Sequence, residues 1–316
     1  MAKEKNKKHF LERHKNKIFF LNNPTAYKRI VAQAVKRYGH APEHNVFWYQ
    51  YEAHPDQKPI FVSWSNGFGL MTYKEENAWY VFSEPLAAPK KKIPVLVEFI
   101  RHALREKGIK KVVVELTAGT RKLLRQALPE TLRDASINYT LTWPIFDMTK
   151  FNPALPGHGL KRLRNVRNKF YRAHRIGVRD ARTVAKTDLH RIAEKWKKMR
   201  GGTDQTYDHR YRNLIENNFA GTQTARAIFV DGKAAALNAS WPITNRPGHY
   251  YAGVGIHDYS MPSLGEIMNL EDLEWIKNAG YKTADFGGGE KALTNFKKKF
   301  GPSSYYKTFI FSVVRR

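Results

Sequence analysis

The fold of this chain is decided by the stretch GYKTADFGGGEKALTNFKKKFGP, residues 280–302. A short strand here ends at Asp285, and the glycine turn Gly287–Gly289 follows it. Next comes a short helix with two phenylalanines one turn apart, a spacing that predicts a core-facing side. Lys297 therefore lies on one side of that helix, close to the end of the strand. A glycine run after a strand can hold a phosphate through backbone N–H groups, although flexible turns look the same.

The order of elements around this stretch indicates a duplicated α/β domain. In the first half we predict a helix at 24–38, strands at 46–51, 60–64, 67–73 and 78–82, a helix at 93–107, a strand at 111–116, a helix at 120–127 and a strand at 139–146. In the second half we predict a helix at 159–175, a strand at 178–184, helices at 188–199 and 208–219, strands at 225–230, 234–241 and 249–254, a helix at 263–279, a strand at 282–286, a helix at 293–300 and a strand at 305–314. The halves share a pattern of elements but little sequence. We therefore divide the chain into a basic N-terminal arm (1–22), a first lobe (23–150), and a second lobe (151–316) that opens with a basic helix.

Composition restricts the class of protein and of partner. The 316 residues include 42% hydrophobic residues, which is enough for real cores. Lys and Arg number 55 against 28 Asp and Glu, a net charge of +27 that favours nucleic acid, anionic membrane surfaces or phosphorylated ligands as partners. The absence of cysteine excludes disulfides, thiolate metal sites and cysteine nucleophiles. No apolar run approaches the length of a membrane-spanning helix, so we expect a soluble, cytoplasmic protein.

The most basic helix of the chain begins the second lobe. Between residues 161 and 175 it carries seven Lys or Arg and no acidic residue, so no ion pair within the helix relieves their repulsion. Its apolar stripe consists of Leu160, Leu163, Val166 and Phe170. The ordinary interpretation of such a charge run is a solvated surface. The alternative is phosphate binding, which we assign to Lys161, Arg162, Arg164, Arg167 and Lys169.

The common catalytic signatures are missing from the sequence. There is no G-x-S-x-G, no H-E-x-x-H and no kinase motif set. The twelve histidines show no metal-ligand spacing, so no metal site is predicted. His249 or His257 is a possible general base, although an isolated histidine is more often structural.

Three stretches resemble one family. The run YYAGVGIHDYSMPSLGEIMNLEDLEWIKNAGYKTADFGG…NFKKKFGP is similar to the C-terminal lobe of GNAT-like aminoacyl transferases, which include the Fem peptidyltransferases and the C-terminal domain of phosphatidylglycerol lysyltransferase. The matching positions are Asp285-Phe286-Gly287 and Phe296-Lys297…Phe300-Gly301. Upstream, WYVFSEPLAAPKKKIPVLVEFIRHALREKGIKKVVVEL resembles the first lobe of the lysyltransferase, with Glu84 of Ser83-Glu84-Pro85 where the family has Asp. The basic helix resembles the helix that precedes the family's second lobe.

The resemblance implies tandem GNAT-type lobes with mixed, mostly antiparallel sheets flanked by helices. It implies a transferase that moves an amino acid from aminoacyl-tRNA to an amine or hydroxyl of a lipid, peptide or small metabolite, with no cofactor. Lys297 would stabilise the developing oxyanion or the departing ribose. Asp285 would orient the incoming amine or cap the glycine turn. Substrate binding is assigned to Phe296, Tyr251 and Glu266, and tRNA binding to the five cations of the basic helix.

Two other functions stay open at this point. An acyl-CoA-dependent N-acyltransferase would use CoA, but the segment Ser260–Gly265 lacks the arginine and the second glycine of the usual pyrophosphate turn. A non-catalytic RNA-binding protein would bind charged and uncharged tRNA equally. Peripheral contact with anionic lipid is a further possibility, and no DNA partner is expected.

Overall fold

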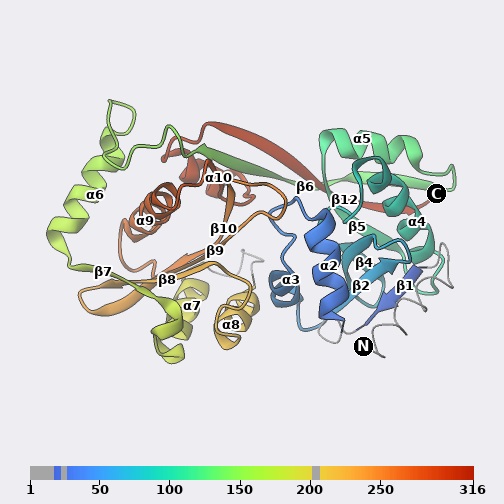
Figure 1. Ribbon diagram of the computed structural model, residues 1–316, viewed down its shortest axis with the longest axis horizontal. Coiled ribbons are helices and arrows are strands. Elements are labelled where there is room, and N and C mark those ends of the chain that lie inside the picture. The colour runs from blue at the N-terminus through green and yellow to red at the C-terminus, as the bar shows by residue number, and fades with distance from the viewer. Residues whose placement is uncertain (1–17, 23–26, 201–206) are drawn as a thin grey trace. The chain divides into compact units, whose positions relative to one another are not determined.

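The computed structural model describes residues 18–22, 27–200 and 207–316, which form two compact units (Figure 1). The first unit contains the described residues up to Leu141 together with 307–316, and the second contains 142–306. Two long strands, β6 (Leu132–Asp147) and β12 (Ser304–Arg315), contribute residues to both units. The end of the chain thus returns to the first unit, whereas the sequence placed all of 151–316 in the second lobe.

The sheet of the first unit is mostly antiparallel. Its strand order is β1-β2-β3-β4-β5-β12, with β1 at Ile18–Leu21, β2 at Lys58–Trp64, β3 at Gly69–Lys74, β4 at Ala78–Val81 and β5 at Lys111–Thr117. Only β4 and β5 pair in parallel, because helix α4 (Lys92–Ala103) connects them. Residues 18–21 of the predicted arm form β1, which pairs with β2, and residues 1–17 lie outside the described residues.

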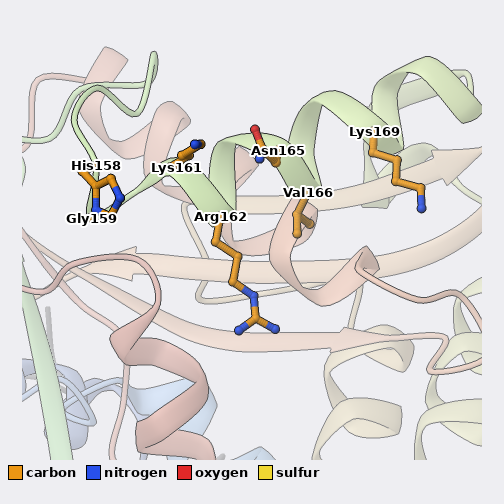
Figure 2. Close-up of a pocket in the computed structure, with 7 residues that line it drawn as sticks. All are labelled: His158, Gly159, Lys161, Arg162, Asn165, Val166 and Lys169. Atoms are coloured by element: carbon orange, nitrogen blue, oxygen red, sulfur yellow. The ribbon is translucent and has the colours of Figure 1, made fainter.

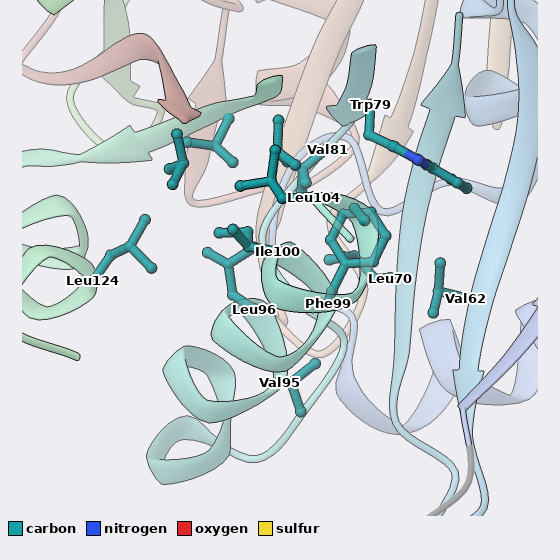
Figure 3. Close-up of a cluster of buried hydrophobic side chains, with 14 of the residues drawn as sticks. Val62, Leu70, Trp79, Val81, Val95, Leu96, Phe99, Ile100, Leu104 and Leu124 are labelled. Carbon is teal, nitrogen blue, oxygen red and sulfur yellow. The ribbon is translucent and has the colours of Figure 1, made fainter. Parts of the chain in front are cut away.

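The main core of the first unit lies between this sheet and α4, with α5 (Ala118–Ala127) beside it (Figure 3). Along β5 the residues Val112, Val114 and Leu116 are buried, while their neighbours are partly exposed. This alternation points one side of the strand into the core. The buried side chains of α4 then complete a continuous apolar layer.

A second core of the first unit contains α2 (Lys28–Tyr38) and α3 (Val46–Glu52). Our prediction of a strand at 46–51 is therefore wrong. The Asn45 side chain accepts hydrogen bonds from the N–H groups of Phe47 and Trp48, which caps a helix at this point. β-Branched and aromatic residues favour a strand, but here the cap and the burial of Trp48 and Tyr49 determine the conformation.

The second unit is also built on a mostly antiparallel sheet. Its strand order is β6-β11-β10-β9-β8-β7, with β7 at Ile176–Asp180, β8 at Thr224–Val230, β9 at Lys233–Pro242, β10 at His249–His257 and β11 at Thr283–Asp285. Its helices are α6 (Lys161–Ala173), α7 (Lys186–Arg200), α8 (His209–Glu216), α9 (Leu264–Asn278) and α10 (Lys291–Lys298). The predicted class, mixed α/β with mostly antiparallel sheets flanked by helices, is confirmed.

Strands β10 and β11 pair over a short stretch and then separate, and this separation positions the candidate site. The two strands are parallel and are paired from His249 with Thr283 to Tyr251 with Asp285. Beyond this point β11 ends, whereas β10 continues along β9 after an irregularity between Tyr251 and Val254. The glycine turn follows the end of β11, and the Lys297 side chain of α10 reaches this turn.

Candidate active site

Asp285 is buried at the end of β11. One carboxylate oxygen, Oδ1, accepts a hydrogen bond from the backbone N–H of Gly287 at 2.9 Å. The other, Oδ2, accepts one from the Tyr306 hydroxyl, also at 2.9 Å. Asp285 therefore caps the glycine turn, one of the two roles that the sequence suggested. Burial raises the pKa of its carboxyl to about 6, with both hydrogen bonds and nearby Lys297 and Arg246 acting in the opposite direction.

Lys297 is buried on α10 and reaches the same turn. Its Nζ donates hydrogen bonds to the carbonyl oxygens of Phe286 and of Gly287, the latter at 3.1 Å. Burial lowers the pKa of the ammonium group to about 8, and the neighbouring Asp285 carboxylate acts in the opposite direction. A buried acid and a buried base thus sit beside one turn, with pKa values on either side of neutrality. Perturbed groups of this kind are characteristic of functional sites.

The glycine turn allows three of the predicted residues to meet. Gly287 has a φ of 73°, a backbone conformation that other residues rarely adopt. A β-carbon at Gly287 would lie 3.4 Å from the Tyr251 hydroxyl oxygen and 3.8 Å from Lys297 Nζ. The structure therefore brings Asp285, Lys297 and Tyr251 together at one point.

Aromatic rings surround this point. Trp143 from β6 stacks on Tyr306 from β12, with ring centroids 5.4 Å apart and ring planes within 12°. Trp241 from β9 packs edge-on against Tyr251 at 5.1 Å. A β-carbon at Gly288 would lie only 2.6 Å from Trp143, so the turn is packed directly against the indole. These rings give the buried carboxylate and ammonium a rigid, low-dielectric setting.

The other two predicted substrate-binding residues form a separate group. Glu266, in the first turn of α9, accepts a hydrogen bond from Lys299 Nζ at 2.8 Å. The Lys299 ammonium also lies over the Phe296 ring, 4.8 Å from its centroid, and Phe296 packs edge-on against Phe300. The structure brings Glu266 and Phe296 together through Lys299, but neither shows a contact with Asp285 or Tyr251.

The five predicted tRNA-binding cations divide into two groups on α6. Arg164 donates hydrogen bonds to the carbonyl oxygens of Leu155 and Gly157, and Arg167 to that of Pro153. Lys161, Arg162 and Lys169 instead line an open depression together with His158, Gly159, Asn165 and Val166 (Figure 2). The first group fixes the segment before the helix, and the second group faces solvent.

The histidines considered as bases have other contacts. His249 Nδ1 lies 2.6 Å from the Thr283 hydroxyl, and burial together with Arg246 lowers its pKa. The His257 ring packs against the Tyr259 ring, with centroids 4.3 Å apart and the ring planes tilted by 54°. In the described part of the chain no three His, Asp or Glu side chains are grouped as metal ligands.

No helix in the described ranges has the length and apolar character needed to cross a membrane.

Trp143, Trp241 and Tyr306 were not predicted as site residues. Trp143 and Tyr306 come from strands rich in aromatic and β-branched residues, a composition that many core strands share, and Trp241 is the one aromatic residue of the alanine-rich strand β9. Tyr306 lies 21 positions after Asp285, and nothing in its local pattern distinguishes it from Tyr305. Only the ring contacts in the folded structure show that these side chains surround the glycine turn.

Comparisons with known proteins agree with this architecture. The family model described as phosphatidylglycerol lysyltransferase, C-terminal, matches residues 53–310. The structure of L-PGS from Bacillus licheniformis aligns with a TM-score of 0.65 at 17% identity, covering 93% of this chain and 92% of that one. The C-terminal domain of a candidate lysylphosphatidylglycerol synthetase from Agrobacterium fabrum aligns with a TM-score of 0.66 at 15% identity, again covering 93% of this chain and 92% of that one.

A more distant structure identifies the wider fold. A tandem GNAT protein from the clavulanic acid biosynthesis pathway aligns with a TM-score of 0.56 at 12% identity, covering 95% of this chain and 98% of that one. The fold of the chain is therefore GNAT-like, as the resemblance implied. No curated protein sequence matches significantly.

Proposed function

Because the chain belongs to the phosphatidylglycerol lysyltransferase C-terminal family, we propose that it transfers an aminoacyl group from aminoacyl-tRNA to a hydroxyl group of a phospholipid. The observation that carries this proposal is the meeting of Asp285, Lys297 and Tyr251 where β10 and β11 separate. The family is one of lysyltransferases, so lysine is the first amino acid to test.

The reaction needs one negative charge stabilised and one proton moved. The acceptor oxygen attacks the ester carbonyl carbon of the aminoacyl-tRNA and forms a new C–O bond. The resulting oxyanion then expels the oxygen of the 3′-terminal ribose, which takes up a proton. Two hydrogens of the Lys297 ammonium bond to backbone carbonyls, which leaves a third to donate to the oxyanion or to the departing ribose oxygen.

Asp285 takes the proton of the acceptor hydroxyl in this scheme. Its pKa of about 6 leaves it mostly ionised at neutral pH yet more basic than an ordinary aspartate. Tyr306 holds the Oδ2 atom, and the Gly287 amide holds Oδ1, so the carboxylate has a fixed orientation. Tyr251 lies beside both groups and would contact the reacting ester.

The start of α9 argues against CoA as the donor. Asp258 is buried in the loop before α9, where its carboxylate accepts hydrogen bonds from the N–H and hydroxyl groups of Ser260 and forms an ion pair with Lys195. Glu266 occupies the first turn of the helix. The two lysines at this end of the helix, Lys195 and Lys299, are thus already paired with carboxylates, so neither is available to bind the pyrophosphate of CoA. An RNA donor instead suits a chain of net charge +27.

The direct test is transfer in a purified system. The chain is incubated with tRNA carrying radiolabelled lysine and with vesicles of phosphatidylcholine, with or without phosphatidylglycerol. Label that enters the lipid extract only when phosphatidylglycerol is present supports the proposal. Binding of charged and deacylated tRNA is measured in parallel, with CoA as a control ligand.

The alternatives give different results. Label that stays on tRNA with every acceptor, together with equal affinity for charged and deacylated tRNA, indicates a non-catalytic RNA-binding protein. Binding of CoA without binding of tRNA indicates an acyl-CoA-dependent N-acyltransferase.

A further inference from the structure

Three buried polar side chains meet between α9 and β9. Asp272 of α9 is 2% exposed, and Asn238 and Ser240 of β9 are 3% and 0% exposed. Both β9 side chains lie beside the Asp272 carboxyl. Among the described residues, none of Asp272 Oδ1, Asn238 Oδ1 and Ser240 Oγ has a hydrogen-bond partner. A buried polar atom without a partner costs free energy, so the protonation state of the carboxyl decides whether these atoms can be satisfied.

The register of the sheet turns the two β9 side chains towards α9. Asn238 pairs with Arg226 of β8, and Ser240 lies two positions along the same strand, so the three side chains share one face. Arg226 donates to the backbone carbonyl and to the carboxylate of Glu271 on α9. Asn238 Nδ2 donates to the carbonyl oxygen of Met268 at 3.2 Å. This face of the sheet therefore packs against α9.

The charged groups around Asp272 leave its carboxyl without a cation of its own. In the described part of the chain, the one cation that acts on it is Arg226, and the Glu271 carboxylate already balances the charge of this guanidinium. Glu271 also accepts a hydrogen bond from the Tyr171 hydroxyl of α6. Strand β10 contributes Tyr250, whose hydroxyl stays neutral because burial raises its pKa. An ionised Asp272 would thus be a buried negative charge with no partner.

A proton on Asp272 would pair all three unsatisfied atoms. A carboxylate and an amide oxygen are both acceptors, so the ionised form cannot bond to Asn238 Oδ1. The protonated acid can donate to this oxygen, and its carbonyl oxygen can accept from the Ser240 hydroxyl. Burial raises the pKa of the Asp272 carboxyl to about 6, with the adjacent Arg226, Asn238 and Ser240 side chains acting in the opposite direction.

We infer that Asp272 forms a proton-dependent contact between α9 and β9. Below about pH 6 the protonated acid donates to Asn238 and holds the helix on the strand. Above this pH the same place holds an uncompensated buried carboxylate, which weakens the attachment of α9. The folded chain therefore carries a pH-sensitive device in its second unit.

This device lies behind the strand that lines the candidate site. Ser240 is followed on β9 by Trp241, which points to the opposite face of the sheet and packs against Tyr251. The inference concerns the stability of the folded chain, so it stands or falls separately from the proposed aminoacyl transfer.

The experiment compares the folding equilibrium of the unchanged chain with that of Asp272→Asn, by urea denaturation between pH 4 and pH 7. Asparagine cannot ionise, and it offers both a donor and an acceptor, as the protonated acid does. A carboxyl whose pKa is raised by folding stabilises the folded chain at low pH and loses this contribution as the pH rises through the folded value. With the pKa raised from 3.8 to about 6, the ratio of the two folding equilibrium constants, unchanged chain over variant, should fall roughly 50-fold from pH 4 to pH 7.

Two further variants make this comparison specific. Groups other than Asp272 are common to both chains, so their titration cancels in the ratio. The matched control is Glu274→Gln, which removes an exposed carboxylate from the same helix and should give a ratio that stays nearly constant with pH. Asp272→Leu is similar in size and equally unable to ionise, so it should reproduce the fall in the ratio if Asp272→Asn does not fold.

Three results would overturn the inference. The first is a ratio for Asp272→Asn that stays constant between pH 4 and pH 7. The second is an equal fall for Glu274→Gln, which would mean that the net charge of the helix is responsible. The third is stabilisation at pH 7 by sodium chloride, but not by tetramethylammonium chloride, in the unchanged chain and not in Asp272→Asn. That result would make the cluster a buried cation site instead of a proton site.

Discussion

Among the residues that the structure describes, each unit contains one pair of parallel strands, and the two pairs end in different surroundings. In the second unit β10 and β11 separate at Tyr251 and Asp285, and residues 286–290 follow before α10 begins. In the first unit the parallel pair β4–β5 runs to Tyr80 and Val113. There β5 continues to Thr117 and passes directly into α5, with the Thr117 hydroxyl accepting from the Thr120 N–H at 3.3 Å.

The difference shows what converts this topology into a candidate active site. The first unit has an apolar valine where the second has Asp285, and its strand is followed by a capped helix instead of a glycine turn. Its polar cluster lies instead after β4, where Glu84 accepts hydrogen bonds from His40 and Lys92, both at 2.9 Å. We interpret that cluster as structural and expect the chemistry in the second unit alone.

Loss of Lys297 should have the largest effect. We expect Lys297→Ala to slow aminoacyl transfer by roughly 10- to 100-fold or more, because it removes the only buried cation at the glycine turn among the described residues. The measurement is the single-turnover rate of label entering lipid. Lys298→Ala, an exposed neighbour, is the matched control and should retain full activity. A Lys297→Ala rate near that of the unchanged chain would remove this residue from the mechanism.

Glycine-to-alanine substitutions after β11 and after β5 should have opposite effects on the free energy of unfolding. Gly288→Ala places a β-carbon 2.6 Å from Trp143 and should lower the free energy of unfolding by about 1–3 kcal/mol. Gly119→Ala, at the start of α5 in the first unit, meets no atom within 4 Å and should raise it by about 0.5–1 kcal/mol. Urea denaturation measures both. Equal changes in the free energy of unfolding at Gly288 and Gly119 would contradict the tight packing at Gly288 and the open space at Gly119.

The Glu84 cluster should affect stability but not catalysis. The hydrogen bond from His40 is the main cause that lowers the pKa of Glu84 from 4.5 to about 2, with Lys92 adding to it. The cluster therefore stabilises the fold above about pH 4.5, and this contribution is lost as the pH falls towards 2. Glu84→Gln should cost about 1–2 kcal/mol at pH 7 and flatten the acid limb of stability. Transfer activity that falls with Glu84→Gln, at unchanged stability, would place chemistry in the first unit.

The centre of the candidate site could be predicted from residues 280–302 because the relevant signals are local. A strand ending in Asp285, a glycine turn and Lys297 beside two phenylalanines lie within 20 residues, and the structure keeps them together. The aromatic surroundings could not be predicted. Trp143 and Tyr306 lie on strands far apart in the sequence, and only the order of strands in the sheet makes them neighbours.

The contacts of the α6 cations and the conformation of residues 46–51 could be established only from the structure, for different reasons. A run of basic residues does not show which side chains bind the chain's own backbone. The sequence therefore could not distinguish Arg164 and Arg167, which bind backbone carbonyls, from Arg162 and Lys169. The aromatic content of residues 46–51 favoured a strand, although the Asn45 cap gave a local signal for a helix.

The pH dependence of single-turnover transfer tests the central claim most directly. The claim is that Asp285 and Lys297, and no group of the first unit, carry the reaction. With the pKa of Asp285 raised to about 6 and that of Lys297 lowered to about 8, the rate should rise as the pH passes 6 and fall as it passes 8. Asp285→Asn should remove the rise and keep the fall. A rate that changes neither near pH 6 nor near pH 8, or a rise that persists in Asp285→Asn, would contradict the account.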